Sequence, residues 1–299
     1  MTPHRPPSFP RRARTLAEGL RRYALNDRVL RRGQRGPATA VVLHLYYPES
    51  WGLFADRLRA LSGRPFDLFV TMPREHLTFA DDVRGDHPGA HVLEAPNRGR
   101  DVLPFLKTAR HLEARGYEHV LKLHSKRSAH RTDGRERLTA ILDVLLPTDE
   151  ATLGSLLSVL GDPGTGVVGP ESQYVTLTKN YAANRRHVVR ALSHAHSAAL
   201  ARWVDRNTSD FGFFAGTMFW ARLDALAPVL RRNYGLRDFG HESGQIDGTF
   251  AHGLERVLCV SPELQGRTMY EVAADGVRPI AYASENWVDA FRPRGQPVD

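Results

Sequence analysis

The chain alternates short apolar segments with segments of helical periodicity from residue 38 to about residue 170. We expect strands at Ala38–Leu45, Phe66–Val70, Ala90–Glu94, Tyr117–His124 and Gly166–Gly169, and helices at Pro48–Leu61, Val102–Arg115, Glu136–Leu146 and Glu150–Leu160. Strands that alternate with helices are typical of parallel βαβ units. The pattern therefore predicts an α/β fold with a mostly parallel central sheet flanked by helices, and 299 residues suffice for one such domain.

The later part of the chain has longer and less regular segments. We expect one long helix at Arg185–Arg206, an aromatic strand at Phe211–Ala221, a helix that begins near Ser243–Asp247, and a last strand at Arg256–Val260. Residues 261–299 show little periodicity, and we expect them to wrap around the domain as a tail. Residues 37–299 are thus predicted to form one domain.

The formal net charge of +8 is concentrated in residues 1–36. This arm holds ten arginines and only two acids, whereas basic and acidic side chains balance in the rest of the chain. Leu16, Leu20 and Tyr23 follow helical spacing. The arm is therefore either an amphipathic helix on an anionic membrane surface or a solvated helix packed on the domain. Nucleic-acid binding is not expected, because no reader motif accompanies the basic residues.

The apolar segments are too short to cross a membrane. The longest, such as Ala38–Leu45 and Phe211–Ala221, fall well short of the roughly 20 residues that a spanning helix needs. The basic N-terminus lacks the apolar core of a secretory signal, and the single cysteine, Cys259, cannot form an internal disulfide. We expect a protein of the reducing cytoplasm, soluble or peripheral on the inner face of the cell membrane.

Cationic side chains follow one of the expected strands. Lys122, His124 and Lys126 occupy every second position, so on an extended backbone they share one face, and the leucines between them share the other. The polar segment Asn97–Asp101 follows the preceding strand. Because ligands of open α/β sheets bind beyond the carboxyl ends of strands, these two segments predict a site for an anionic ligand such as a phosphate.

Two further segments carry small or acidic residues. Gly216 lies at the centre of the aromatic strand, next to Thr217, where a ligand or a second backbone can approach closely. Glu242 and Asp247 flank the expected start of the next helix, where an acid either caps the helix or faces the cleft. The chain has no P-loop, no zinc-ligand spacing and no Gly-x-Ser-x-Gly turn, which disfavours a phosphatase or a kinase-like transferase.

Four ordered motifs resemble the rhamnan-synthesis protein F family, glycosyltransferase-like proteins of bacterial surface polysaccharide assembly. They are Asn-Arg-Gly-Arg-Asp-Val-Leu-Pro-Phe at 97–105, Lys-Leu-His-Ser-Lys-Arg-Ser at 122–128, Phe-Phe-Ala-Gly-Thr-Met-Phe-Trp at 213–220 and Asp-Gly-Thr-Phe-Ala-His at 247–252. The resemblance covers about residues 38–260 and implies a fold like that of the GT-A glycosyltransferases. It also implies transfer of rhamnose or a related deoxysugar from a dTDP- or GDP-linked donor to a polysaccharide or lipid-linked acceptor.

The resemblance also bears on metal binding. GT-A enzymes usually carry Asp-x-Asp at the end of the fourth strand, where it holds a divalent metal on the donor diphosphate. This chain has Leu-His-Ser-Lys at 123–126 instead, so no carboxylate pair is available there for Mg²⁺ or Mn²⁺. We therefore expect no metal cofactor.

Roles can be assigned to the residues of these motifs. The expected donor-binding residues are Asn97, Arg100, Asp101, Lys122, His124, Lys126, Gly216 and Thr217. Their cations would stabilise the charge that grows on the leaving diphosphate. The acceptor hydroxyl needs a base, for which Asp247 is the first candidate and Glu242 the second. The expected acceptor loop contains Tyr174, Lys179 and Asn184. A non-catalytic sugar-nucleotide-binding or scaffold protein is the alternative, and it would keep the cations without needing Asp247.

Overall fold

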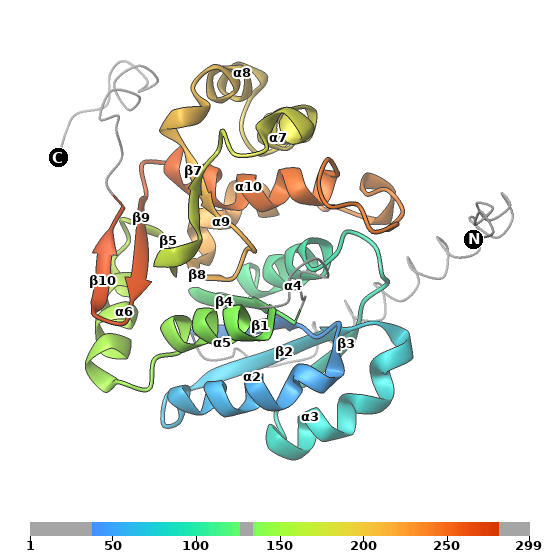
Figure 1. Cartoon of the computed structure of the whole chain (residues 1–299), viewed down its shortest axis with the longest axis vertical. Helices are drawn as coiled ribbons and strands as arrows, with labels where there is room; N and C mark the ends of the chain where they lie inside the picture. Colours follow the sequence, from blue (N-terminus) through green and yellow to red (C-terminus); the bar gives the residue numbers. More distant parts are fainter. Residues whose placement is uncertain (1–37, 126–133, 281–299) are drawn as a thin grey trace, which may run out of the picture.

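The centre of the molecule is a twisted sheet with helices on both faces (Figure 1). Within residues 38–125 and 134–280, which this computed structural model describes, eight strands form this sheet in the order β10-β9-β5-β8-β4-β1-β2-β3. They are β1 (Thr39–His44), β2 (Phe66–Met72), β3 (His91–Glu94), β4 (His119–His124), β5 (Thr165–Pro170), β8 (Phe219–Arg222), β9 (Thr268–Ala273) and β10 (Gly276–Pro279). Only β8 and β10 run against the direction of the other described strands of this sheet. The expected α/β fold with a mostly parallel sheet is confirmed, and the sheet is compatible with a GT-A-like fold.

Two hydrophobic cores lie on the two faces of the sheet. The first contains side chains of α2 (Trp51–Leu58), α3 (Ala80–Asp86), α5 (Gly134–Leu145) and α6 (Glu150–Gly161). The second contains side chains of α4 (Val102–Glu113), α7 (Tyr181–Ala195), α8 (Ala198–Arg206), α9 (Leu223–Leu230) and α10 (Phe250–Glu263), and of β7 (Gly212–Phe214). β7 pairs antiparallel with β6 (Tyr174–Thr176) in a separate small sheet.

The strands and helices expected between residues 38 and 170 are present, with ends that differ by a few residues. The alternation along β4 is also confirmed. Leu121 and Leu123 belong to the core with α2 and α5, whereas Val120 belongs to the opposite core. Lys122 and His124 therefore face the side of the sheet that is covered by α4 and α10.

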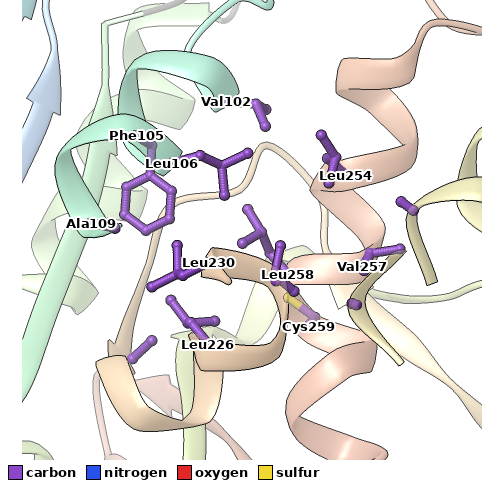
Figure 2. Close-up of a cluster of buried hydrophobic side chains, with 14 of the residues drawn as sticks. Val102, Phe105, Leu106, Ala109, Leu226, Leu230, Leu254, Val257, Leu258 and Cys259 are labelled. Carbon is purple, nitrogen blue, oxygen red and sulfur yellow. The ribbon is translucent and has the colours of Figure 1, made fainter. Parts of the chain in front are cut away.

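The prediction of a strand at Arg256–Val260 is wrong, because these residues lie within α10. Leu258 and Cys259 of this helix pack with Phe105 of α4 and Leu226 of α9 in the core shown in Figure 2. α10 is buried along most of its length, so its sequence has no polar face to reveal a helical period. A short apolar run of this kind does not distinguish a buried strand from a buried helix.

Two other expected elements are each divided in two. The helix expected at Arg185–Arg206 is interrupted after Ala195, and Ser197 caps α8 by accepting a hydrogen bond from the backbone N–H of Leu200 at 3.1 Å. The strand expected at Phe211–Ala221 is β7 and β8, which belong to different sheets. Residues 215–217 form the turn between them.

The region after residue 240 differs most from expectation. α10 begins at Phe250 rather than near residues 243–247, and its cap is Thr249, whose hydroxyl accepts from the N–H of His252. The described part of the expected tail supplies β9 and β10 to the main sheet. In the described residues no helix combines the length and hydropathy needed to span a membrane. The basic arm at 1–36 and Lys126 lie outside the described residues.

Candidate functional site

A buried ion pair joins two of the sequence motifs at the carboxyl edge of the sheet. Nζ of Lys122 on β4 donates to Oδ2 of Asp101, at the start of α4, over 2.5 Å, and the two side chains are 1% and 3% exposed. The same Nζ donates to the carbonyl and the hydroxyl oxygen of Thr217 at 2.8 and 3.2 Å. The structure thus brings Asp101, Lys122 and Thr217 together as expected. The Lys122 charge is thus paired within the protein, and its role in donor binding stays a prediction.

Glu242 holds the turn that precedes α4. Its carboxylate accepts from the backbone N–H of Gly99 at 3.1 Å and from Nε of Arg100 at 3.2 Å. Both turn residues have left-handed backbones, with φ of 74° at Gly99 and 55° at Arg100. Nη1 of Arg100 donates a hydrogen bond to Nε2 of His252 at 2.8 Å. Through these contacts Glu242 positions the turn, and its role as an acceptor base stays a prediction.

A second left-handed turn faces the first across the site. Gly216 and Thr217 have φ of 90° and 50°. The carbonyl of Gly216 lies 2.5 Å from Nε2 of His124, the last residue of β4. A Cβ on Gly216 would meet no atom within 4 Å, so the glycine serves the backbone conformation rather than a close contact with the rest of the protein.

These two turns border a cavity of about 210 Å³, which we call the carboxyl-edge cavity. Its lining is mixed in charge, with Arg100, Asp101, His124, Arg137, His252 and Glu255 beside the apolar Leu138, Ile141, Met218 and Ile246. Ile246 stands at its rim and is 74% exposed. Sites that enclose drug-sized ligands usually measure about 300–1,000 Å³, so this space fits a sugar or a phosphate group rather than a whole nucleotide sugar.

A larger cavity of about 340 Å³ lies at the opposite edge of the sheet, near the start of β2. Its charged residues form ion pairs or hydrogen bonds with other residues of the protein. Arg59 pairs with Asp56, Arg64 pairs with Glu150, and Asp86 accepts from the indole N–H of Trp51. Because open α/β sheets bind ligands at the carboxyl ends of their strands, we assign the functional site to the smaller cavity.

The remaining predicted residues lie at the margin of this site or away from it. The Asn97 amide lies 3.3 Å from the hydroxyl of Tyr46 at the surface. The Asp247 carboxylate is directed toward the start of α10, 3.7 Å from Nδ1 of His252 and 3.6 Å from Nη2 of Arg256. Its neighbour Ile246 lines the cavity. The roles of Asn97 and Asp247 stay predictions.

The expected acceptor loop is not a single surface. Tyr174 packs on Phe214, and Lys179 is exposed. Asn184 is fully buried on α7, where its side-chain oxygen accepts from the N–H of Gly248 at 3.1 Å. Asn184 therefore positions the loop before α10 and is not accessible to an acceptor.

Three ionisable residues of the cavity lining were not among the predicted site residues. Arg137 lies on α5, and His252 and Glu255 lie on α10. His252 and Glu255 are three residues apart, so on a helix they share a face. The helix expected to begin near residues 243–247 includes both positions, but its sequence does not show which face is turned toward the cavity, and nothing in the sequence separates Arg137 from other surface arginines.

The described residues contain no group of three or more His, Cys, Asp or Glu side chains arranged to hold a metal ion. Asp101, the carboxylate nearest the end of β4, is held by Lys122. Metal-free chemistry stays a prediction.

Comparison with known proteins agrees with the motifs. Residues 14–264 match the family described as rhamnan synthesis protein F. Two relatives from Xanthomonas campestris pv. campestris, strains B100 and ATCC 33913, are each described as uncharacterized protein WxcX, and they are 35% identical to this chain over 229 residues. The matched region is 74% of this chain and 31% of each relative, so the chain spans about a third of the length of these relatives. This chain belongs to the rhamnan synthesis protein F family.

Proposed function

We propose that this chain is a glycosyltransferase that moves rhamnose or a related deoxysugar from a nucleotide-sugar donor to a polysaccharide or lipid-linked acceptor. The observation that carries the proposal is the carboxyl-edge cavity, where cationic and carboxylate side chains line one space of sugar size. Membership of a family of polysaccharide synthesis supports the same reaction class.

The donor end of the reaction needs positive charge that is fixed in advance. Sugar transfer leaves a nucleoside diphosphate, on which negative charge grows in the transition state. Arg100, Arg137 and His124 line the cavity and would face this charge. Lys122 would act indirectly, because its ion pair with Asp101 ties β4 to both turns of the site.

The acceptor end needs a base that reaches the cavity. Glu255 lines the cavity from α10, whereas the Asp247 carboxylate lies against His252 and Arg256. We therefore propose Glu255 as the residue that takes the proton of the acceptor hydroxyl, with Asp247 as the alternative. A positioned base typically contributes about 10² to 10⁴ in rate.

Binding and turnover separate this proposal from a scaffold role. Full-length protein should be warmed with dTDP-rhamnose, GDP-rhamnose and the free nucleoside diphosphates. A ligand that binds only the folded state raises the melting temperature. Release of nucleoside diphosphate in the presence of an acceptor supports the enzyme. The other result is that a nucleotide sugar raises the melting temperature while no acceptor fraction from a producing cell leads to release of nucleoside diphosphate. That result identifies a sugar-nucleotide-binding or scaffold protein instead.

A pair of isosteric variants tests the base. Glu255→Gln should lower the transfer rate by about 10² to 10⁴ while donor affinity changes little. Asp247→Asn, the matched control, should keep most of the rate. The reverse ranking would return the role to Asp247, and two active variants would remove both residues from the chemistry.

Chelation tests the metal-free expectation. Donor binding and transfer should persist in EDTA, because the end of β4 carries His124 in place of a carboxylate pair. Activity that disappears on chelation and returns with Mn²⁺ would overturn this expectation, without affecting the assignment of the cavity.

A further inference from the structure

The helical hairpin formed by α7 and α8 carries an unusual charge balance. It lies at one end of the molecule, on the side of α10 that is remote from β1 and β2 (Figure 1). Between Tyr181 and Arg206 it contains five arginines and one acid, Asp205. In the rest of the described residues, acidic side chains outnumber basic ones. The hairpin is therefore the place where positive charge accumulates on the described part of the chain.

A groove of about 480 Å³ runs along this hairpin, and we call it the arginine groove. It is lined by Arg185, Arg186 and Val189 of α7 and by Arg202, Asp205 and Arg206 of α8. All four arginines are exposed. The groove thus combines an apolar floor at Val189 with guanidinium groups that water can reach.

Only one of these arginines is neutralised. Asp205 accepts two hydrogen bonds from Arg185, at 2.7 and 2.6 Å, and a third from the hydroxyl of Tyr181 at 2.8 Å. Arg186, Arg202 and Arg206 form no ion pair with any other described residue. Arg206 interacts with Asp205 only at longer range. Three exposed cations without an ion pair beside one groove indicate an anionic ligand, and guanidinium pairs well with phosphate oxygens.

The kind of anion follows from how the donors are presented. A site for one small phosphorylated molecule usually fixes it with backbone N–H groups or buried side chains. Here the uncompensated donors sit on long, exposed side chains of two helices, which can adapt to several phosphates at once. We propose that the outer surface of the α7–α8 hairpin docks on an anionic membrane surface, with lipid phosphates paired to Arg186, Arg202 and Arg206. This site consists of residues of α7 and α8 and includes none of residues 1–36.

The inner side of α7 connects this surface with the carboxyl-edge cavity. The side-chain oxygen of Asn184 accepts from the N–H of Gly248, and Nε2 of His187 lies 3.0 Å from the carbonyl of the same residue. Gly248 follows the loop residue Ile246 that lines the cavity. The proposed docking surface is therefore one helix away from the wall of the cavity.

Full-length protein and sedimented vesicles test the proposal. Arg186→Gln, Arg202→Gln and Arg206→Gln are combined in one variant. The control combines Arg59→Gln, Arg74→Gln and Arg84→Gln, three exposed arginines beside or within α2 and α3, and it removes the same charge from that end of the molecule. Each basic residue near an anionic surface contributes about fivefold in affinity, so the hairpin variant should bind phosphatidylglycerol vesicles about 100-fold more weakly at low salt. The control should change binding less than threefold, and phosphatidylcholine vesicles should bind neither.

The other outcomes are distinct. Equal loss in both triple variants would show a general charge effect and would overturn the site, as would unchanged binding of the hairpin variant. Inorganic pyrophosphate provides a further arm by calorimetry. If only the hairpin variant loses pyrophosphate binding while vesicle binding is unchanged, the groove serves a soluble anion and the membrane proposal fails. The three single variants, each expected to weaken binding about fivefold, keep the test valid if the triple variant does not fold. Vesicle binding is independent of sugar transfer, so failure here leaves the proposed function intact.

Discussion

Lys122 and Asp101 place opposite charges where almost no water reaches. Relative to an apolar pair, such an ion pair contributes little net stability, but removing one partner leaves a buried charge that costs about 3–5 kcal/mol. The pair therefore matters for geometry. It ties the start of α4 to β4 and, through the Thr217 contacts of Lys122, to the turn before β8.

We expect Lys122→Met to lower the free energy of unfolding by about 3–5 kcal/mol, because Asp101 is left buried without its cation. Lys122→Met combined with Asp101→Leu should recover much of this loss. Urea unfolding followed by circular dichroism measures both. If the double variant loses the sum of the two single losses, the residues are not coupled and the ion pair is not a unit.

His44 lies beside this pair, buried at the end of β1, with Nδ1 3.0 Å from the hydroxyl oxygen of Thr71. Burial lowers the pKa of His44 from 6.5 to about 4, although the nearby Asp101 acts in the opposite direction. The unfolded chain thus takes up a proton near pH 6.5, and the folded chain does so only near pH 4. Stability is therefore lost as the pH falls through this window, by up to about 3 kcal/mol.

Unfolding free energies at pH 7, 5.5 and 4 test this dependence. His44→Gln should show a smaller fall than the wild type, because the group that binds a proton on unfolding is gone. Parallel curves for wild type and His44→Gln would assign the acid sensitivity to other groups.

At the scale of elements, α10 packs tightly against α7 at Gly253. A Cβ built there would lie 2.6 Å from the Cβ of His187 and 2.7 Å from its backbone carbonyl carbon. Because Asn184 and His187 of α7 also hold both backbone groups of Gly248, this contact sets the position of the loop before α10.

Two glycine substitutions within helices test this packing. Gly253→Ala should lower the melting temperature, because overpacking costs about 1–3 kcal/mol and the gain in helix propensity is at most about 1 kcal/mol. Gly154→Ala in α6 is the matched control, since its Cβ would meet nothing within 4 Å. It should raise stability by about 0.5–1 kcal/mol. A rise in both variants would show that α7 moves aside without cost.

At the scale of the whole molecule, β9 and β10 complete the sheet. β9 pairs with β5 on one side and β10 on the other, and it buries Met269 and Val272 completely. The described part of the segment after residue 261 is therefore structural, and the expected wrapping tail is replaced there by two strands.

Truncation after Leu264 tests this dependence. The shortened chain should lose its cooperative thermal transition, because β5 keeps β8 but loses β9, the second of its two partner strands, and each lost buried side chain forfeits about 1.5–3 kcal/mol. Circular dichroism and binding of a hydrophobic dye report the change. A truncated chain that melts cooperatively near the wild-type temperature would contradict a structural role for β9.

The fold was predictable where the hydrophobic period was clear. The first four strands are short apolar segments that are mostly buried, and the helices α2, α4, α5 and α6 combine buried and exposed positions at helical spacing, so the sequence identifies them. The errors fall where the period is hidden. α10 is buried along most of its length, and the aromatic segment 211–221 changes sheets at a turn that its apolar residues conceal.

The part of the candidate site that lies at the ends of strands was predictable from the sequence. Side chains alternate between the two faces along β4, so Lys122 and His124 lie on one face, and the sheet brings the segment Asn97–Asp101 beside them. Periodicity along one strand does not reveal that Asp101 neutralises Lys122, because this contact joins residues 21 apart through the packing of α4. Arg137 and Glu255 reach the cavity by the same kind of tertiary placement.

The two left-handed turns of the site restrict which substitutions can raise thermostability during evolution. Arg100 and Thr217 adopt positive φ without being glycine, which costs of order 1 kcal/mol each and most for the β-branched threonine. Selection for heat resistance alone would favour glycine or asparagine at both positions. Such replacements would remove the hydroxyl that contacts Lys122 and the guanidinium that joins Glu242 to His252. Thermostability and an intact site are therefore opposed at positions 100 and 217, and lineages from hot environments should have gained their stability elsewhere in the chain.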